Sequence, residues 1–156
     1  MTILKKLKDT LEKNGLAYEV GFHPEVFTAQ EIAAAQHIPG KEMAKVVIAK
    51  ADGKMLMLVL PASYQIDMKK LKKALKAKKI GIAKEKQFEE LFPDCEVGAM
   101  PPFGNLYNLD VWVDQVLTED ASIVFQAGNH TETVRIKYSD YARLVNPKVG
   151  DFSVHI

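Results

Sequence analysis

Residues 44–60 read AKVVIAKADGKMLMLVL, and this stretch decides the fold. It holds two apolar runs, 44–50 and 54–60, which have the length and aliphatic content typical of strands. Asp52-Gly53 lies between them and is a strong signal for a two-residue hairpin turn, because both turn positions favour residues that tolerate positive φ. The stretch therefore predicts two antiparallel strands joined by a tight turn.

Outward from this hairpin, helical and strand patterns mix without strict alternation. Thr28 with Glu31 forms a capping box, and Asp67 and Ser139 are also expected to cap helices. The expected helices cover 2–14, 29–36, 68–77, 85–91 and a last helix that ends at Leu144, and the further expected strands cover 17–22, 80–83, 106–113, 121–127 and 133–137. This order predicts an α+β or mixed α/β class around one sheet.

Composition limits the class of protein. The chain has 156 residues, 47% of them hydrophobic, and a formal net charge of +1. We expect one compact domain over 1–156, because this length leaves little room for a second and the apolar content excludes a disordered chain. The single cysteine excludes an internal disulfide and favours a reducing compartment. With no membrane-length apolar run and no signal peptide, we expect a cytoplasmic protein.

The common catalytic motifs are missing. The chain has no Gly-x-Ser-x-Gly motif and no phosphate loop that ends in Gly-Lys-Ser/Thr. Its four histidines are far apart in the sequence, so no metal site is expected. Cys95 lies between Asp94 and Glu96, and these acidic neighbours raise a thiol pKa and disfavour a reactive thiolate.

Three short features could carry chemistry, and each also has a structural interpretation. Lys45 begins an apolar strand, where it could extend from the sheet edge to solvent or point into a cleft and hold a phosphate or ribose oxygen. The loop 98–104, GAMPPFG, could be a plain connection or present backbone groups to a ligand. The segment 127–130, AGNH, could be an exposed turn or part of a pocket wall.

Basic residues are concentrated in the first part of the chain. Residues 1–86 hold 17 Lys or Arg and 9 Asp or Glu, whereas residues 87–156 hold 4 and 11. The expected helix 68–77 is rich in lysine, with Lys69, Lys72, Lys73 and Lys76 beside an apolar stripe. Solvation alone would explain these lysines, but so would a polyanion partner such as RNA, which counterion release would favour.

Taken together, these features resemble a known family. His23, the capping box at Thr28, Lys45 on a strand, Asp52-Gly53, the Gly98-x-x-x-Pro102 loop and Ala127-Gly128 occur in the order seen in the YbaK/prolyl-tRNA-synthetase-associated editing domains. The resemblance spans about residues 16–145. It implies a mixed, barrel-like sheet flanked by helices, and a trans-acting deacylase that hydrolyses the ester of mischarged tRNA without a metal or organic cofactor.

The resemblance also implies partners and residue roles. The expected partners are mischarged tRNA and an aminoacyl-tRNA synthetase, with no membrane and no DNA. Lys45, Gly98 and Pro102 would be catalytic. From their charge, rather than from the resemblance, Lys69, Lys72, Lys73 and Lys76 are expected to contact the tRNA backbone. The substrate-binding residues would be His23, Phe27, Thr28, Pro101, Gly104, Gly128, Asn129 and His130.

Two departures from the family pattern lie where the amino acid would be selected. Met100-Pro101 replaces a small hydroxyl residue before the loop proline, and Gly128-Asn129-His130 replaces a pair of glycines. Two other functions remain open at this stage. One is a non-catalytic RNA-binding module or synthetase adaptor, suggested by the lysine-rich helix. The other is a different hydrolase with Cys95 or His130 as nucleophile.

Overall fold

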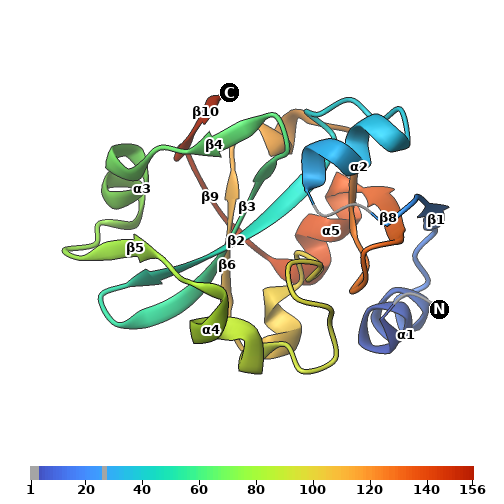
Figure 1. Cartoon of the computed structure of the whole chain (residues 1–156), viewed down its shortest axis with the longest axis horizontal. Helices are drawn as coiled ribbons and strands as arrows, with labels where there is room; N and C mark the ends of the chain where they lie inside the picture. Colours follow the sequence, from blue (N-terminus) through green and yellow to red (C-terminus); the bar gives the residue numbers. More distant parts are fainter. Residues whose placement is uncertain (1–3, 26–27) are drawn as a thin grey trace.

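The computed structural model describes residues 4–25 and 28–156. Figure 1 shows the whole chain as helices packed around several strands. The α-helices are α1 (Lys5–Lys13), α2 (Ala29–Ala35), α3 (Met68–Leu75), α4 (Glu85–Phe88) and α5 (Tyr138–Val145). The strands are β1 (Glu19–Phe22), β2 (Ala44–Ala51), β3 (Lys54–Pro61), β4 (Tyr64–Ile66), β5 (Ile80–Ile82), β6 (Asp110–Asp114), β7 (Ser122–Gln126), β8 (Glu132–Lys137), β9 (Lys148–Gly150) and β10 (Ser153–His155). Three 3-10 helices are η1 (Glu89–Leu91), η2 (Gly104–Tyr107) and η3 (Leu117–Glu119).

The predicted hairpin is the centre of the largest sheet. β2 and β3 pair antiparallel over their full lengths, and Asp52 and Gly53 both adopt positive φ in the turn, as expected. The sheet has the order β5-β2-β3-β6-β9, with β3, β6 and β9 parallel. The sheet is buried on both faces, as β3 shows. Met57 and Val59 join one apolar cluster, and Leu58 and Leu60 join another on the opposite face.

Two smaller sheets complete the fold. β1, β8 and β7 form an antiparallel sheet, and β10 pairs with β4. A parallel bridge between Met43 and Val124 joins the start of β2 to β7. The expected α+β class is confirmed, but the barrel-like sheet takes the form of these three sheets, which do not close into a barrel.

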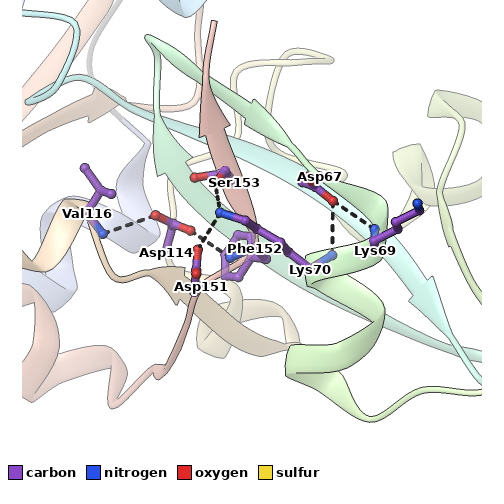
Figure 2. A network of polar contacts seen from close by, with 8 residues as sticks. All are labelled: Asp67, Lys69, Lys70, Asp114, Val116, Asp151, Phe152 and Ser153. Carbon is purple, nitrogen blue, oxygen red and sulfur yellow. Dashed lines mark hydrogen bonds and ion pairs between the residues drawn. The ribbon is translucent and has the colours of Figure 1, made fainter.

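The C-terminal segment is held against α3 by polar contacts, which Figure 2 shows. Asp67 caps α3, as predicted, by accepting hydrogen bonds from the backbone N–H groups of Lys69 and Lys70. The Lys70 ammonium group donates to Asp151 and to the backbone oxygen of Ser153. Asp114 is fully buried and accepts from the backbone N–H groups of Phe152 and Val116. These contacts close one face of the large sheet.

Two local predictions were wrong. The segment 106–113 was predicted as one strand, but its first residues lie in the 3-10 helix η2, and β6 begins only at Asp110. Gly104 allows this 3-10 turn to pack closely, since an added Cβ would lie 2.8 Å from Val111 Cγ2. Ser139 was predicted to cap the last helix, but it lies inside α5, whose N-cap is Lys137 with no side-chain hydrogen bond.

Candidate functional site

Lys45 and Gly98 lie in the wall of the same cavity. This cavity has a volume of about 160 Å³ and is lined by Ala29, Ala44, Lys45, Val46, Gly98, Met100 and Gln126. The lining residues come from the start of α2, the start of β2, the end of β7 and the loop before η2. The strand lysine and the glycine-proline loop, more than fifty positions apart in the sequence, therefore meet at one hollow.

Lys45 is a half-buried cation at the start of β2. Its Nζ donates a hydrogen bond of 3.4 Å to the backbone oxygen of Ala62, and no carboxylate lies within ion-pair distance among the described residues. Burial lowers the pKa of the Lys45 ammonium group below its ordinary value. The side chain keeps donors available for an oxygen atom of a ligand.

The loop that carries Gly98 has a backbone that most residues would not adopt. Gly98 has a φ of +84°, where a side chain would be strained. The loop is held by the turn at Gly128: Glu96 N donates to Gly128 O at 2.8 Å, and Gly128 N donates to Ala99 O at 2.9 Å. Gly98 is thereby presented to the cavity on a rigid backbone.

His130 supports this loop from behind. Its Nε2 lies 2.8 Å from Val97 O, in hydrogen-bond contact, and 4.0 Å from Glu96 Oε2. Its Cε1 lies 3.7 Å from the position of a Cβ on Gly98. His130 is absent from the cavity lining. The geometry gives it a positioning contact with the loop.

The prolines of the loop are anchored in the core. Pro101 and Pro102 are buried, and Tyr141 Oη donates a hydrogen bond of 2.7 Å to Pro102 O. Neither proline lines the cavity, whereas Met100 does. Gly104 lies in η2, packed against β6. Of the loop residues predicted to be catalytic or substrate-binding, Gly98 lines the cavity and Pro101, Pro102 and Gly104 do not.

Two further predicted substrate-binding residues, His23 and Thr28, are not part of the cavity lining. His23 is buried, with Nδ1 2.7 Å from Pro24 O. Thr28 completes the predicted capping box of α2, accepting from Glu31 N, and its neighbour Ala29 lines the cavity. Phe27 lies outside the described residues.

Gly128 and Asn129 line a second cavity instead, which has a volume of about 300 Å³. The Asn129 side-chain oxygen accepts hydrogen bonds from Thr131 N, Thr131 Oγ1 and Glu132 N. It shapes the turn between β7 and β8.

Gln126 is a cavity residue that the sequence analysis did not identify. It is 8% exposed, and its side-chain oxygen has no hydrogen-bond partner among the described residues. It follows Phe125 on β7, and alternation along the strand turns it away from the core cluster that Phe125 joins. The sequence signal was the lone amide in the apolar run SIVFQA.

Cys95 contributes no nucleophile to this cavity. Burial is the largest of the effects that raise its pKa to about 11, and Asp94 adds to them. Its Sγ lies 3.3 Å from Tyr107 Oη, and the residue lines the second cavity with Asn129. A neutral, shielded thiol fits the expectation from its acidic neighbours.

The lysine-rich helix is α3. Its Leu71 is fully buried, whereas Lys69, Lys72, Lys73 and the C-cap residue Lys76 are exposed. Lys70 differs, because it is paired with Asp151. Figure 1 shows α3 on one side of the molecule and α2, next to the cavity, on the other. The four lysines therefore form a basic surface apart from the cavity.

Neither a metal-binding cluster nor a membrane-spanning helix occurs in residues 4–25 and 28–156. No group of three or more His, Cys, Asp or Glu gathers there in a way that could hold a metal ion. Within the same ranges, no helix has both the length and the apolar content needed to cross a bilayer.

The chain is similar to proteins of translation quality control. It is 26% identical, over 95% of its length and 91% of the relative, to the multifunctional Ser/Thr-tRNA deacylase ProXp-y of Escherichia coli K12. A proline–tRNA ligase of Bacillus mycoides is 25% identical over 101 residues, which cover 65% of this chain and 17% of the ligase.

Solved structures show the same fold. The hypothetical protein APE2540 has a TM-score of 0.85 at 20% identity, over 96% of this chain and all of that one. A proposed trans-editing enzyme for prolyl tRNA synthetase has a TM-score of 0.83 at 18% identity, over 97% of this chain and 96% of that one. The family profile described as the aminoacyl-tRNA editing domain matches residues 23–144. That match covers most of the chain, so this protein belongs to the aminoacyl-tRNA editing domain family and is an aminoacyl-tRNA deacylase, as the resemblance implied.

Proposed function

We propose that the cavity between Lys45 and Gly98 is the catalytic site, and that it removes small hydroxylated amino acids from mischarged tRNA in trans. The observation that carries this proposal is the shared cavity itself. It places a half-buried cation opposite a rigid, glycine-containing backbone. Both are groups that can act on an aminoacyl ester without a covalent intermediate.

The reaction needs three functions from the protein. Lys45 would hold a phosphate or ribose oxygen of the terminal adenosine as a compact cation. Backbone groups of the Gly98 loop would polarise the ester carbonyl and orient the attacking water. The water oxygen bonds to the carbonyl carbon, the carbon–oxygen bond to the ribose breaks, and the ribose oxygen takes the proton. Free amino acid and intact tRNA are the products.

The size of the cavity supports a small aminoacyl group. A volume of about 160 Å³ is small for a ligand pocket and is enough for a side chain of a few non-hydrogen atoms. The relative from E. coli is described as a Ser/Thr-tRNA deacylase, which makes serine and threonine the first candidates. Apolar fit separates neighbouring side chains by only ~1–3 kcal/mol per methylene, so a second hydrolytic step is useful after synthesis.

The remaining proposals concern partners and place. The exposed lysines of α3 would bind the tRNA backbone. Lys45 is near the start of β2. Near the other end of β2, Ala49–Ala51 pair with β5, and β5 contacts α3. Along a strand this separation is ~15–20 Å, which a few terminal nucleotides can span. A prolyl-tRNA synthetase is the proposed partner, and the cytoplasm the proposed compartment.

The test is deacylation of a panel of mischarged tRNAs by the wild type, Lys45→Met and Lys50→Met. Lys50 lies on the same strand but is exposed, so its variant is the matched control. We expect Lys45→Met to lower kcat/KM at least 100-fold, and Lys50→Met to change it less than threefold. The melting temperature of the Lys45→Met variant should not fall, because the substitution removes a cation whose burial carries a desolvation cost.

Two results would contradict the proposal at different levels. If the wild type released no amino acid from any tRNA of the panel, the activity would be wrong. If the wild type and Lys45→Met were equally fast, the catalytic site would have to be elsewhere.

A further inference from the structure

We infer that Gln126 is the residue that recognises the side-chain hydroxyl of the aminoacyl group, and so distinguishes serine from alanine and threonine from valine. This inference rests on the proposed function of the cavity. It assigns the choice of amino acid to a strand residue, whereas the family resemblance points to the loop and the turn for that choice.

The first argument is the state of the Gln126 side chain. The residue is only 8% exposed, and its carboxamide oxygen has no hydrogen-bond partner among the described residues. Buried polar groups in folded proteins nearly always have a partner, because an unmade hydrogen bond is costly. Gln126 lines the cavity, so an amide whose oxygen has no partner is placed in the cavity wall, where it can form a hydrogen bond with a ligand.

The second argument is its position. Gln126 lines the same cavity as Lys45 and Gly98, the two elements proposed to hold the ends of the ester. It lies at the last position of β7, and the Gly128 turn, which holds the Gly98 loop, follows two residues later. A strand residue next to that loop has a well-defined position, which a specificity contact requires.

The chemistry of the cavity favours a hydroxyl over the substrate ammonium group. A hydroxyl can donate to the carboxamide oxygen and accept from the carboxamide nitrogen, so it matches the amide in either orientation. An ammonium group only donates. It would also add a second positive charge beside the half-buried Lys45, where low polarity strengthens repulsion.

The same geometry explains how an analogue is rejected. Alanine and valine would leave the Gln126 amide buried and without a partner once the cavity is closed by substrate. A site built to hydrogen-bond a hydroxyl rejects a substrate that lacks it much more strongly than an apolar pocket rejects a shorter side chain. We expect the wild type to prefer serine over alanine by about 10- to 100-fold in kcat/KM.

The experiment compares Ser with Ala, and Thr with Val, each esterified to the same tRNA. The variants are Gln126→Met, which keeps the length of the side chain, and Met100→Leu, which changes an apolar residue of the same cavity. We expect Gln126→Met to bring the Ser/Ala and Thr/Val ratios of kcat/KM to within threefold of one. Met100→Leu should leave both ratios within threefold of their wild-type values.

Each outcome is decisive. A ratio that Gln126→Met leaves at the wild-type value overturns the inference, as does an equal loss on Ser and Ala, which would indicate a contact to a group that both share. Because each ratio is internal to one protein sample, partial unfolding does not change it. If the variant does not fold, the wild type still decides: no preference for Ser over Ala overturns the inference. A wild type with no activity on any of these substrates contradicts the proposed function instead.

Discussion

The two ends of β2 each border a cavity, and the cavities differ in kind. At the hairpin end a hollow of about 410 Å³ is lined by apolar residues of β5 and by three exposed charged groups, Lys50, Asp52 and Lys79. At the other end the hollow of about 160 Å³ contains a half-buried lysine and a buried amide. In the larger cavity the carboxylate of Asp52 has partners, because it accepts hydrogen bonds from the backbone N–H groups of Lys78 and Lys79.

This difference shows that a candidate site is better recognised by buried polar groups that lack hydrogen-bond partners than by the volume of its cavity. Asp52 holds the hairpin turn to the segment after α3, and those backbone hydrogen bonds keep its pKa below the ordinary value. Lys45 and Gln126 have no comparable structural role, although burying each costs free energy. A protein retains such a cost where a ligand removes it.

The largest expected effect comes from a matched pair of glycines, one in each cavity wall. Gly98 and Gly53 have almost the same φ, +84° and +86°, so an alanine is strained similarly at both. We expect Gly98→Ala and Gly53→Ala each to lower the free energy of unfolding by ~1 kcal/mol. Only Gly98→Ala should lower kcat/KM, by at least 100-fold, because the strain is relieved by moving the loop.

Urea unfolding and deacylation of a seryl-tRNA measure the two quantities. An equal loss of activity in both variants would show that activity follows stability alone, and the comparison of the two cavities would then fail. A Gly98→Ala variant with full activity would remove the loop from the catalytic site.

The fold was predictable where local patterns and burial agree. Residues 44–60 became β2 and β3 because both faces of this hairpin are buried, and the capping residues Thr28 and Asp67 act as expected. The short strands β4, β9 and β10 were missed, since each has three residues and depends on a distant partner. The 3-10 helix η2 was missed because its apolar residues also suit a strand.

Residues of the candidate site could be predicted only where a residue type is unusual in its place. A lysine in an apolar strand and a glycine-proline loop pointed to Lys45 and Gly98, and the cavity joins them. Gln126 was missed because the strand pattern separates the two faces of β7 but does not reveal which of them borders a cavity. His130 lies beside the loop, but the sequence could not show that it touches Val97 rather than the cavity.

The exposed lysines of α3 should affect binding and leave the chemistry unchanged. For a variant with Lys72, Lys73 and Lys76 all changed to Gln, we expect KM for the tRNA to rise about 10-fold at low salt, with kcat unchanged. The slope of log KM against log salt concentration should also become shallower, because fewer counterions are released. Deacylation rates over a range of salt concentrations measure both quantities.

A triple change at Lys5, Lys8 and Lys13 is the control. It removes the same charge from α1, which Figure 1 shows on the side of the molecule opposite α3. If both triple variants raised KM equally, the effect would come from total charge, and α3 would not be the surface that binds tRNA.

The smallest expected effect is a change in stability at a buried acceptor outside both cavities. It tests whether every buried polar group without a partner marks a ligand site. Asp120 Oδ2 is buried without a partner among the described residues, as the Gln126 oxygen is. A carboxylate has an alternative that an amide lacks, which is to bind a proton. Burial raises the pKa of Asp120 to about 6, Glu42 and Glu119 add to the rise, and Lys41 opposes it.

The sign of the stability effect follows from this pKa. Between the ordinary value of 3.8 and about 6 the folded state binds more protons than the unfolded state, so stability falls as pH rises through this window. Asp120→Asn should therefore raise the free energy of unfolding by about 1 kcal/mol at pH 7.5 and by little at pH 4. Asp110 is the control of opposite sign: its hydrogen bond with Lys54 lowers its pKa, so Asp110→Asn should slightly destabilise at pH 7.5. Urea unfolding at the two pH values measures both variants. If Asp120→Asn raised the free energy of unfolding equally at both pH values, Asp120 would not take up a proton on folding. The buried oxygen of Asp120 would then require a ligand as its partner, as the Gln126 amide does.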